Sequence, residues 1–571
     1  MGRVKPIGTR RPLRVPLLAA ALTAASALPV AAQRWTLPLE VQHRVDSVFS
    51  FVERDAPGCA LGVIQDGKLA YGRGYGLANL DWGIPITTAT VFDIGSVSKQ
   101  FTAAAVALLD VEGTLSLDDE VRTWIPELPD YGHSLTLRHM LNHTSGIRDY
   151  LTLMDLKGTD FDNVFDEFDG VELIARQEGL NFDPGAEYLY SNSGYLLLAN
   201  VVRRATGQSV RAFLEDRYFD PLGMAHTLIW DHNREVVAGR ATGYGGGASG
   251  WQIDHAWNFQ MGGDGQVLTS VDDLVKWDGL FYDPVVGGQE LLDRMHTRGV
   301  LNSGDTIDYA LGLNVNRYRG LRRVSHGGAW AGFRAHLVRF PDQHTSAAVL
   351  CNRGDANAGG YAMEVMDVVL ADQLAPAEDE GSGPAPASWM DGEEVALSPA
   401  QLDRWVGIYR TPDRPNYWRF EVRHGSLQML LPDGTSLRLS PRSETRFVAE
   451  RYDVPVAFQP RTDEWPEGVR VGSTVFLRQP AMTLGPSDAD ALPGIYHSAE
   501  LDVDYELRVE EGALVLHRPG SDPLPFLPAV EGEFEAGGVA YLVERDAGGA
   551  PTGFRVYAGR VTDILFRKVT R

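Results

Sequence analysis

The sequence predicts an α+β domain followed by two small antiparallel β-barrel domains. Strand-like segments stand near both ends of residues 33–374, and helical segments lie between them. This order implies one sheet whose strands pair across the whole domain, with helices around it. Residues 395–482 and 483–571 consist of short alternating segments separated by Gly, Pro and Asp turns, which is typical of all-β structure. A chain of 571 residues also exceeds a single hydrophobic core.

Residues 1–32 predict a signal peptide. A basic segment comes first, an apolar stretch follows, and Val30-Ala31-Ala32 is a cleavage site of the A-x-A type. We therefore expect the mature protein in the periplasm or outside the cell. Arg10 and Arg11 also resemble a twin-arginine signal, so the Sec and twin-arginine routes both stay open. Beyond the leader no run of 18 apolar residues occurs, and we expect no stable membrane span after cleavage.

The composition narrows the classes of partner. The net charge is −24, and loss of the basic leader makes it more negative still. Because an acidic surface repels nucleic acid and anionic membranes, neither is expected as a partner. A small-molecule or short-peptide substrate is what the family resemblance given below implies. The histidines show no spacing typical of a metal site, so neither a metal nor another cofactor is expected. The sequence leaves open whether the protein forms a homo-oligomer.

Local patterns place the main elements of the first domain. Strands are expected at residues 59–65 and 69–75, joined by a hairpin turn at Asp66-Gly67. A helix is expected at residues 96–112, because its apolar residues repeat at helical spacing and Gly113 follows as a stop signal. Alanines fill much of the rest of its surface, which predicts a buried position. Further strands are expected at residues 322–325, 333–340 and 346–352.

The C-terminal third contains a linker and a repeat. Residues 375–394 are rich in Pro, Ala, Gly, Ser and acidic residues, a composition typical of a linker. After it, three landmarks recur at one offset of 87 residues, which predicts two copies of one small barrel. These landmarks are Gly407-Ile408-Tyr409 with Gly494-Ile495-Tyr496, Gly425-Ser426-Leu427 with Gly512-Ala513-Leu514, and Phe447 with Phe534.

Ser96 and Lys99 form an S-x-x-K pair on one face of the expected helix. A serine hydroxyl becomes a nucleophile when a neighbouring base takes its proton. Lysine serves as that base only if burial or a like charge lowers its pKa, and the apolar helix supplies burial. Of the 52 lysines and arginines only six are lysines, so Lys99 indicates a role that Arg, which keeps its proton, cannot fill.

Two further motifs complete a resemblance to a known family. Tyr190-Ser191-Asn192 lies downstream, and Ser325-His326-Gly327-Gly328-Ala329 is expected to open a strand. With Ser96 and Lys99 they resemble the three motifs of the serine β-lactamase and penicillin-binding-protein superfamily. Segments 141–147, 221–224 and 267–274 are similar to its class C β-lactamase, D-aminopeptidase and carboxylesterase branch. The resemblance covers about residues 40–372 and implies a β-lactamase-like fold, an antiparallel sheet flanked by helices.

The resemblance implies a role for each matching residue. Ser96 attacks the carbonyl carbon and becomes acylated, while Lys99 and Tyr190 share the proton, with Tyr190 acting as a phenolate or as a relay through Lys99. Asn192 orients Lys99 and binds the substrate. The backbone N–H groups of Ser96 and Ala329 form the oxyanion hole. His143 and Thr144 are interpreted as structural.

The third motif departs from that of the β-lactamases. His326-Gly327-Gly328 stands where those enzymes carry Lys-Thr-Gly, and the resemblance counts His326 and Gly328 among the substrate-binding positions. The exchange removes a fixed positive charge, since His is mostly neutral at pH 7. We therefore expect peptide, amide or ester substrates that lack the β-lactam carboxylate, cleaved in the manner of a D-aminopeptidase, DD-peptidase or carboxylesterase. The sequence does not decide whether Asp264 or Arg334 touches the substrate.

Three alternatives stay open. The chain could instead be a slowly acylated penicillin-recognising sensor, a weak β-lactamase or, on its tail alone, a lipocalin-like carrier; the complete set of motif residues favours turnover. The two β modules are similar to the barrels of D-aminopeptidase and to lipocalin-like tails, where a loop can reach the active site, but a purely structural role is the simpler interpretation. Cys59 and Cys351 fit two buried thiols or a disulfide, because the resemblance places their segments on neighbouring strands.

Overall fold

The structure, a computed structural model, describes residues 36–160, 163–247, 250–255, 258–376, 390, 392–430, 436–450, 454–462, 467–472, 474–480, 482 and 484–569. The predicted signal peptide and most of the predicted linker lie outside these residues. From Leu37 onward the chain forms one compact unit. Within the described part, no helix has the length and apolar character needed to cross a membrane.

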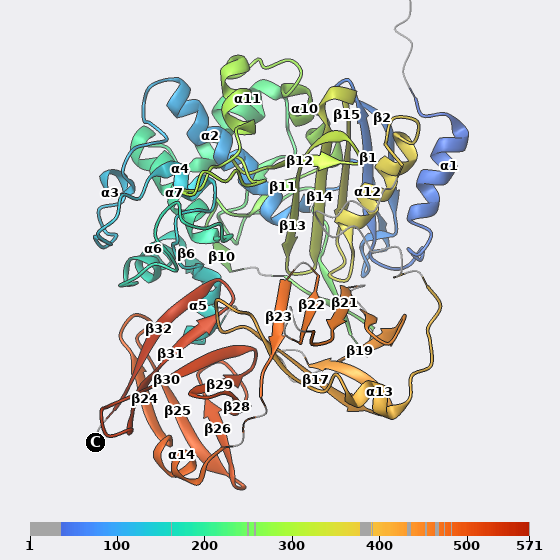
Figure 1. The fold of residues 1–571 in the computed structure, drawn as a ribbon. Helices are drawn as coiled ribbons and strands as arrows, with labels where there is room; N and C mark the ends of the chain where they lie inside the picture. Colours follow the sequence, from blue (N-terminus) through green and yellow to red (C-terminus); the bar gives the residue numbers. More distant parts are fainter. Residues whose placement is uncertain are drawn as a thin grey trace, which may run out of the picture. The chain divides into compact units, whose positions relative to one another are not determined.

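A six-stranded antiparallel sheet forms the centre of the first domain (Figure 1). Its pairing of the first strands with the last ones confirms the predicted closure across the domain. Asp66 and Gly67, both with positive φ, make the hairpin turn that the sequence predicts. In sheet order the strands are β12 Asn314–Tyr318, β13 Leu321–Trp330, β14 Phe333–Phe340, β15 Thr345–Cys351, β1 Cys59–Gln65 and β2 Lys68–Tyr75.

Helices cover both faces of this sheet. The helices α1, Leu39–Val48, and α12, Ala358–Val369, pack on one face, as Figure 1 shows. On the other face α10, Val271–Leu280, lies against β1, β2 and β15. The remaining helices of this domain are α2 Lys99–Val111, α3 Val121–Trp124, α4 Leu137–Leu141, α5 Tyr150–Lys157, α6 Glu167–Ala175, α7 Asn192–Thr206, α8 Val210–Leu214, α9 Asp220–Leu222 and α11 Gly288–His296, with short turns at Gly95–Ser98 (η1, 3₁₀), Glu215–Phe219 (η2, π) and Pro341–Gln343 (η3, 3₁₀).

Small ladders connect the helical region. The first joins β3 Leu77–Asn79 to β4 Ile84–Pro85 and the second joins β6 Phe165–Asp166 to β10 Phe259–Gln260. The others are β8 Tyr244–Gly247 with β9 Gly250–Ile253, and β5 Phe92–Asp93 with β11 Val267–Thr269 and β7 Leu228–Ile229.

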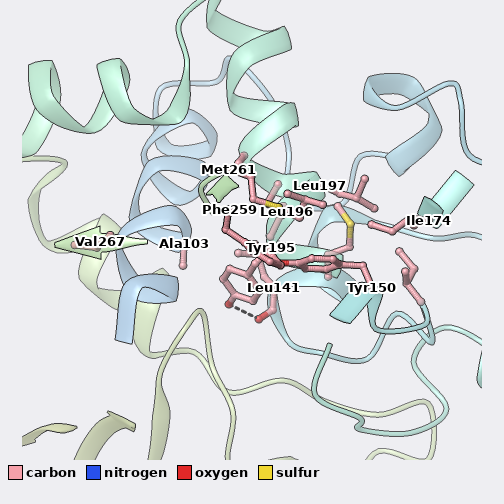
Figure 2. Packing of buried hydrophobic residues seen from close by; sticks show 14 of the residues in the cluster. Ala103, Leu141, Tyr150, Ile174, Tyr195, Leu196, Leu197, Phe259, Met261 and Val267 are labelled. Atoms are coloured by element: carbon pink, nitrogen blue, oxygen red, sulfur yellow. Dashed lines mark hydrogen bonds between the residues drawn. The ribbon is translucent and has the colours of Figure 1, made fainter. Parts of the chain in front are cut away.

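Helix α2 is central and buried, as predicted, but it starts later than expected. Residues Gly95–Ser98 form a 3₁₀ turn, and the α-helix begins at Lys99. Every residue of α2 from Lys99 to Leu109 is buried. Figure 2 shows the surrounding core, in which Ala103 of α2 lies near the α7 side chains and the Tyr195 hydroxyl donates a hydrogen bond of 2.8 Å to the Leu141 carbonyl. The helix is thus held by packing on all sides.

The C-terminal part consists of two antiparallel barrels, as the repeat predicts. Strands β16–β23 close into an eight-stranded barrel, and β24–β32 form a nine-stranded, nearly closed one. The repeated tyrosines make equivalent hydrogen bonds in the two copies. The Tyr409 hydroxyl donates to the Trp405 carbonyl, and the Tyr496 hydroxyl donates to the Leu492 carbonyl.

The bounds of the barrel elements follow the chain. The first barrel comprises α13 Pro399–Asp403, β16 Gly407–Arg410, β17 Tyr417–Arg423, β18 Ser426–Leu430, β19 Ser436–Pro441, β20 Arg446–Ala449, β21 Val454–Gln459, β22 Gly468–Val471 and β23 Thr474–Arg478. The second comprises α14 Pro486–Ala491, β24 Gly494–Ser498, β25 Val503–Glu510, β26 Ala513–His517, β27 Leu524–Pro525, β28 Leu527–Val530, β29 Glu533–Ala536, β30 Val539–Arg545, β31 Pro551–Ala558 and β32 Val561–Lys568.

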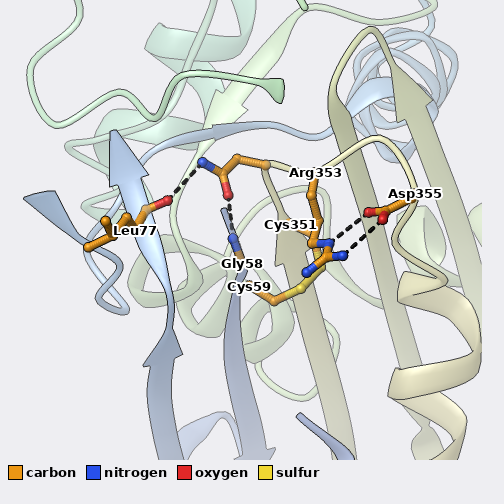
Figure 3. Close-up of a disulfide and its surroundings, with 7 residues drawn as sticks. Gly58, Cys59, Leu77, Cys351, Arg353 and Asp355 are labelled. Atoms are coloured by element: carbon orange, nitrogen blue, oxygen red, sulfur yellow. Dashed lines mark hydrogen bonds and ion pairs between the residues drawn. A yellow bond between two sulfur atoms is a disulfide. The ribbon is translucent and has the colours of Figure 1, made fainter. Parts of the chain in front are cut away.

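Cys59 and Cys351 form a disulfide, which decides between the two interpretations of the cysteines (Figure 3). The two residues are direct partners in the pairing of β1 with β15. Next to them the Asn352 side chain accepts a hydrogen bond from the Gly58 amide and donates one to the Leu77 carbonyl. The bridge therefore fastens the strands that join the two ends of the domain.

Candidate active site

Ser96 lies in the 3₁₀ turn that leads into α2, and Lys99 is the first residue of that helix. The Lys99 Nζ donates a hydrogen bond of 3.2 Å to the Ser96 Oγ. Gly95 precedes the serine with a φ of +49°, and a Cβ there would lie 2.7 Å from the Ala329 nitrogen. Only glycine fits this position, because a side chain would push the serine turn away from the neighbouring strand.

The Lys99 ammonium is completely buried and has three acceptors. Besides Ser96 these are the Asn192 Oδ1 at 2.8 Å and the Asp264 backbone carbonyl at 2.7 Å. Three acceptors match the three N–H donors of an ammonium. Burial nevertheless lowers the pKa of Lys99 to about 8, although the carboxylates of Asp264 and Asp149 favour the charged form. A substantial fraction of Lys99 is therefore neutral near pH 8.

Tyr190 lies against this lysine. The Lys99 Nζ is 4.9 Å from the centre of the Tyr190 ring, and the tyrosine hydroxyl is buried with no hydrogen-bond partner among the described residues. Burial raises the pKa of Tyr190, and the neighbouring Ser96 hydroxyl offsets only part of that rise. The phenol thus keeps its proton at neutral pH, with a hydroxyl left for a substrate.

Asn192 begins α7, and its backbone N–H donates a hydrogen bond of 2.7 Å to the Asp149 Oδ2. Asp149 is in turn the N-cap of α5, where its other oxygen accepts from the Thr152 N–H. A buried carboxylate therefore fixes the start of the helix that carries Asn192. Asp149 was not predicted from the sequence.

The third motif lies in the last part of strand β13, which runs from Leu321 to Trp330. The expectation that the motif opens a strand was therefore wrong. A Cβ on Gly328 would lie 1.9 Å from the Ile94 carbonyl oxygen, which shows how closely the strand approaches the serine turn. This contact brings the backbone of Ala329 next to that of Gly95 and Ser96. The turn and the strand would otherwise be distant, since they are more than 200 residues apart in the sequence.

His326 is buried on the same strand and is neutral. Its Nδ1 lies 2.6 Å from the Gly327 carbonyl and its Nε2 lies 2.9 Å from the Tyr309 hydroxyl. Because a carbonyl only accepts, Nδ1 carries the proton and Nε2 accepts from the tyrosine. Burial lowers the pKa of His326 to about 3. His143 is buried among Tyr190, Tyr195 and Tyr309, as its structural interpretation requires.

A cavity of about 610 Å³ opens over the serine. Of the predicted site residues, Lys99 is buried and is not part of the lining, and the others line the cavity: Ser96, Tyr190, Asn192, His326, Gly328 and Ala329. Asp264 and Arg334, left undecided by the sequence, also line it. So does Tyr150, whose hydroxyl donates a hydrogen bond of 3.1 Å to the Asp264 Oδ2.

Arg560, from the turn between β31 and β32 of the second barrel, completes the lining. Its guanidinium carbon is 4.9 Å from the centre of the Tyr190 ring. Arg560 was not predicted from the sequence, and no local pattern marks it, because only the tertiary fold brings the turn to the cavity. The second barrel therefore contributes a side chain to the candidate active site.

The chain is similar to known proteins over more than half of its length. The family model described as Beta-lactamase matches residues 37–369. The chain is 29% identical to penicillin-binding protein 4* of Bacillus subtilis over 69% of this chain and 88% of that protein. It is 28% identical to a D-aminopeptidase of Brucella anthropi over 80% of this chain and 82% of that one.

Two solved structures share the fold. The octameric penicillin-binding protein homologue from Pyrococcus abyssi has a TM-score of 0.54 at 21% identity, over 76% of this chain and 99% of that one. The D-amino acid amidase from Ochrobactrum anthropi has a TM-score of 0.50 at 21% identity, over 58% of this chain and all of that one.

Proposed function

Since the protein is a serine hydrolase that belongs to the beta-lactamase family, we propose that it cleaves peptide, amide or ester bonds through an acyl-Ser96 intermediate. The observation that carries the proposal is the contact between a buried lysine of lowered pKa and a serine hydroxyl 3.2 Å away, at the floor of a cavity. A neutral amine at this distance can take the serine proton.

In the proposed acylation step the Ser96 Oγ forms a bond to the substrate carbonyl carbon while its proton passes to neutral Lys99. The carbonyl oxygen becomes an oxyanion, for which the N–H groups of Ser96 and Ala329 are the proposed donors. When the tetrahedral intermediate collapses, the bond to the leaving nitrogen or oxygen breaks and that atom takes up a proton. Water then attacks the acyl-serine, releases the acid and restores the serine hydroxyl.

Tyr190 is proposed to be the proton relay. Its raised pKa disfavours a phenolate that acts as the base. The remaining route is a relay in which the neutral phenol passes protons together with Lys99. Its unpartnered hydroxyl can donate to the leaving group and regain a proton from the Lys99 ammonium. Asn192, which accepts a hydrogen bond from Lys99, is proposed to keep the lysine directed at Ser96.

We further propose that the substrate is short and that the enzyme acts after export. The relatives named as D-aminopeptidases favour an exopeptidase or amidase of small D-aminoacyl compounds over a polymer hydrolase. Arg560 supports the idea that a barrel turn limits substrate length, because it contacts the catalytic tyrosine. Export rests on the predicted signal peptide alone.

The test is a burst-and-turnover assay of the mature protein with p-nitrophenyl esters, D- and L-alanyl p-nitroanilides and a chromogenic cephalosporin. We expect turnover that disappears in Ser96→Ala. Ser98→Ala is the matched control, because the Ser98 Oγ accepts a backbone hydrogen bond from Val267 and takes no part in the proposed chemistry. A stoichiometric burst without turnover would favour the slowly acylated sensor, and activity retained by Ser96→Ala would exclude Ser96 as the nucleophile.

A further inference from the structure

The charged side chains that line the cavity in the described part of the chain are Asp264, Arg334 and Arg560. Asp264 already accepts a hydrogen bond from the Tyr150 hydroxyl. Arg334 donates two hydrogen bonds of 2.7 Å to the backbone carbonyls of Ala331 and Phe333. Two positive side chains and one carboxylate therefore line the cavity. His326, which is neutral, adds no charge to the lining.

The turn that carries Arg560 is fastened by its backbone. The Arg560 carbonyl accepts hydrogen bonds from the Asp149 N–H at 3.3 Å and from the Asn181 Nδ2 at 2.9 Å. Behind it a buried ion pair links Arg148 to Glu500 of the same barrel. None of these contacts uses the Arg560 side chain. The turn should therefore keep its position when this side chain is substituted.

The Arg560 guanidinium keeps hydrogen-bond donors free for a ligand. Its ionic partner within the described residues is Asp149, at 3.9 Å from Nη1 to Oδ2, which is beyond hydrogen-bond distance. Both Asp149 oxygens are occupied by the backbone N–H groups of Asn192 and Thr152. The Arg560 side chain remains 45% exposed.

We propose that Arg560 is the subsite for a carboxylate of the substrate next to the scissile bond, and that it disfavours substrates with a free α-ammonium there. A guanidinium matches a carboxylate through two parallel N–H···O bonds, whereas an ammonium in the same place meets a like charge. This inference rests on the proposed function, since the carboxylate is placed relative to Ser96 and Tyr190. Among the substrates of the proposed function, it favours those with a free carboxylate over D-aminoacyl compounds with a free α-amino group.

The proposal also changes the expectation drawn from the third motif. The replacement of a Lys by His326 removes one positive charge from strand β13, and from that we expected a substrate without a carboxylate. Arg560 supplies a positive charge to the same cavity from another domain. In this proposal a residue of the second barrel, and not one of strand β13, recognises the anionic group of the substrate.

The test compares Arg560→Gln, Arg560→Lys and Arg560→Glu with the wild type on two matched substrate pairs. One pair carries the carboxylate on the acyl side, as p-nitrophenyl succinate against p-nitrophenyl butyrate. The other carries it on the leaving group, as N-acetyl-D-alanyl-D-alanine against its C-terminal amide. Arg508→Gln is the charge-matched control, because Arg508 lies exposed on the same barrel and pairs with Glu506.

We expect the wild type to prefer the anionic member of at least one pair by about tenfold in kcat/KM, through a lower KM. Arg560→Gln should abolish this preference, Arg560→Lys should keep part of it, and Arg560→Glu should reverse it. An unchanged preference in Arg560→Gln, or no preference in the wild type, would overturn the subsite.

A binding measurement separates this result from the fate of the proposed function. Calorimetry on Ser96→Ala, with and without Arg560→Gln, compares succinyl-D-alaninamide and N-acetyl-D-alanyl-D-alanine with their neutral amide counterparts. If the wild type shows no turnover, binding that depends on Arg560 would keep the subsite and reject the hydrolase. If the wild type turns over at Ser96 but binding does not depend on Arg560, the hydrolase would be kept and the subsite rejected.

Discussion

Arg148 of the first domain and Glu500 of the second barrel form a buried ion pair, with 2.8 Å between Nη1 and Oε1 and side-chain exposures of 3% and 8%. The segment that contains Arg148 also fixes the site, because the Arg148 carbonyl accepts from the Ser193 hydroxyl and Asp149 accepts from the Asn192 N–H. Asn192 in turn accepts from Lys99. The second barrel is thereby connected to the candidate base through a short series of hydrogen bonds.

Loss of this pair should destabilise the protein strongly. Glu500→Gln leaves the Arg148 charge buried without its counter-ion, and we expect unfolding to become easier by about 3 kcal/mol. The measurement is denaturant unfolding followed by fluorescence. Asp502→Asn is the matched control in the same turn, since its ion pair with Arg176 is exposed and should change stability by less than about 0.5 kcal/mol. Equal effects of the two substitutions would refute the buried pair as an anchor.

The rate of acylation should follow the protonation of Lys99. Because the neutral amine is the base and its pKa is about 8, kcat/KM should rise tenfold per pH unit below that value and level off above it. His326, with a pKa of about 3, should add no inflection near pH 6.5. The measurement is the pH profile of kcat/KM on a neutral ester. Lys99→Arg, which keeps its proton, should lose about 10³-fold in activity; a profile that is flat from pH 6 to 9 would contradict the assignment.

The two glycines of the third motif should differ sharply in their tolerance of a methyl group. In Gly328→Ala the new Cβ would lie 1.9 Å from the Ile94 carbonyl oxygen, so the strand must move away from Ser96 and activity should fall by at least about 10²-fold. In Gly327→Ala the nearest atom is the His336 Nδ1 at 3.3 Å, and most activity should remain. The two kcat/KM values on one ester substrate check this, and equal losses would refute the close approach.

The disulfide should stabilise the first domain through the length of the loop that it closes. Cys59 and Cys351 are separated by 292 residues, and a chain-entropy estimate for such a loop is about 6 kcal/mol. Reductant should therefore lower the thermal unfolding temperature of the wild type. A variant with both cysteines replaced by alanine should unfold at the lower temperature and should not respond to reductant. A double-alanine variant that unfolds at the same temperature as the oxidised wild type would show that the bridge contributes nothing.

Local patterns were sufficient for much of this fold. The turn at Asp66-Gly67, the buried helix after Ser96 and the repeated barrels all follow from spacing and turn chemistry that act over a few residues. The nucleophile and its base stand three residues apart in the sequence, so their motif was visible there. The start of α2 was placed three residues too early, because a 3₁₀ turn precedes the α-helix, as is frequent at helix N-termini.

Features that depend on distant parts of the chain could not be predicted. Arg560 is more than 400 residues from Ser96, and nothing in its turn distinguishes it from other exposed arginines. The choice between phenolate and phenol at Tyr190 depends on burial by side chains of several elements, which a sequence pattern does not contain. Asp149 is a helix cap locally, and only the fold gives its second oxygen to Asn192.

The most direct test of the account is the mass of the protein trapped during turnover. The mature enzyme is mixed with a p-nitrophenyl ester, quenched with acid within the burst phase, and analysed intact and after digestion. We predict a mass increase of one acyl group, located on the peptide that contains Ser96 and absent in Ser96→Ala. An acyl group on another residue would contradict the acyl-Ser96 mechanism. So would turnover in which no acylated protein is found during the burst or after it.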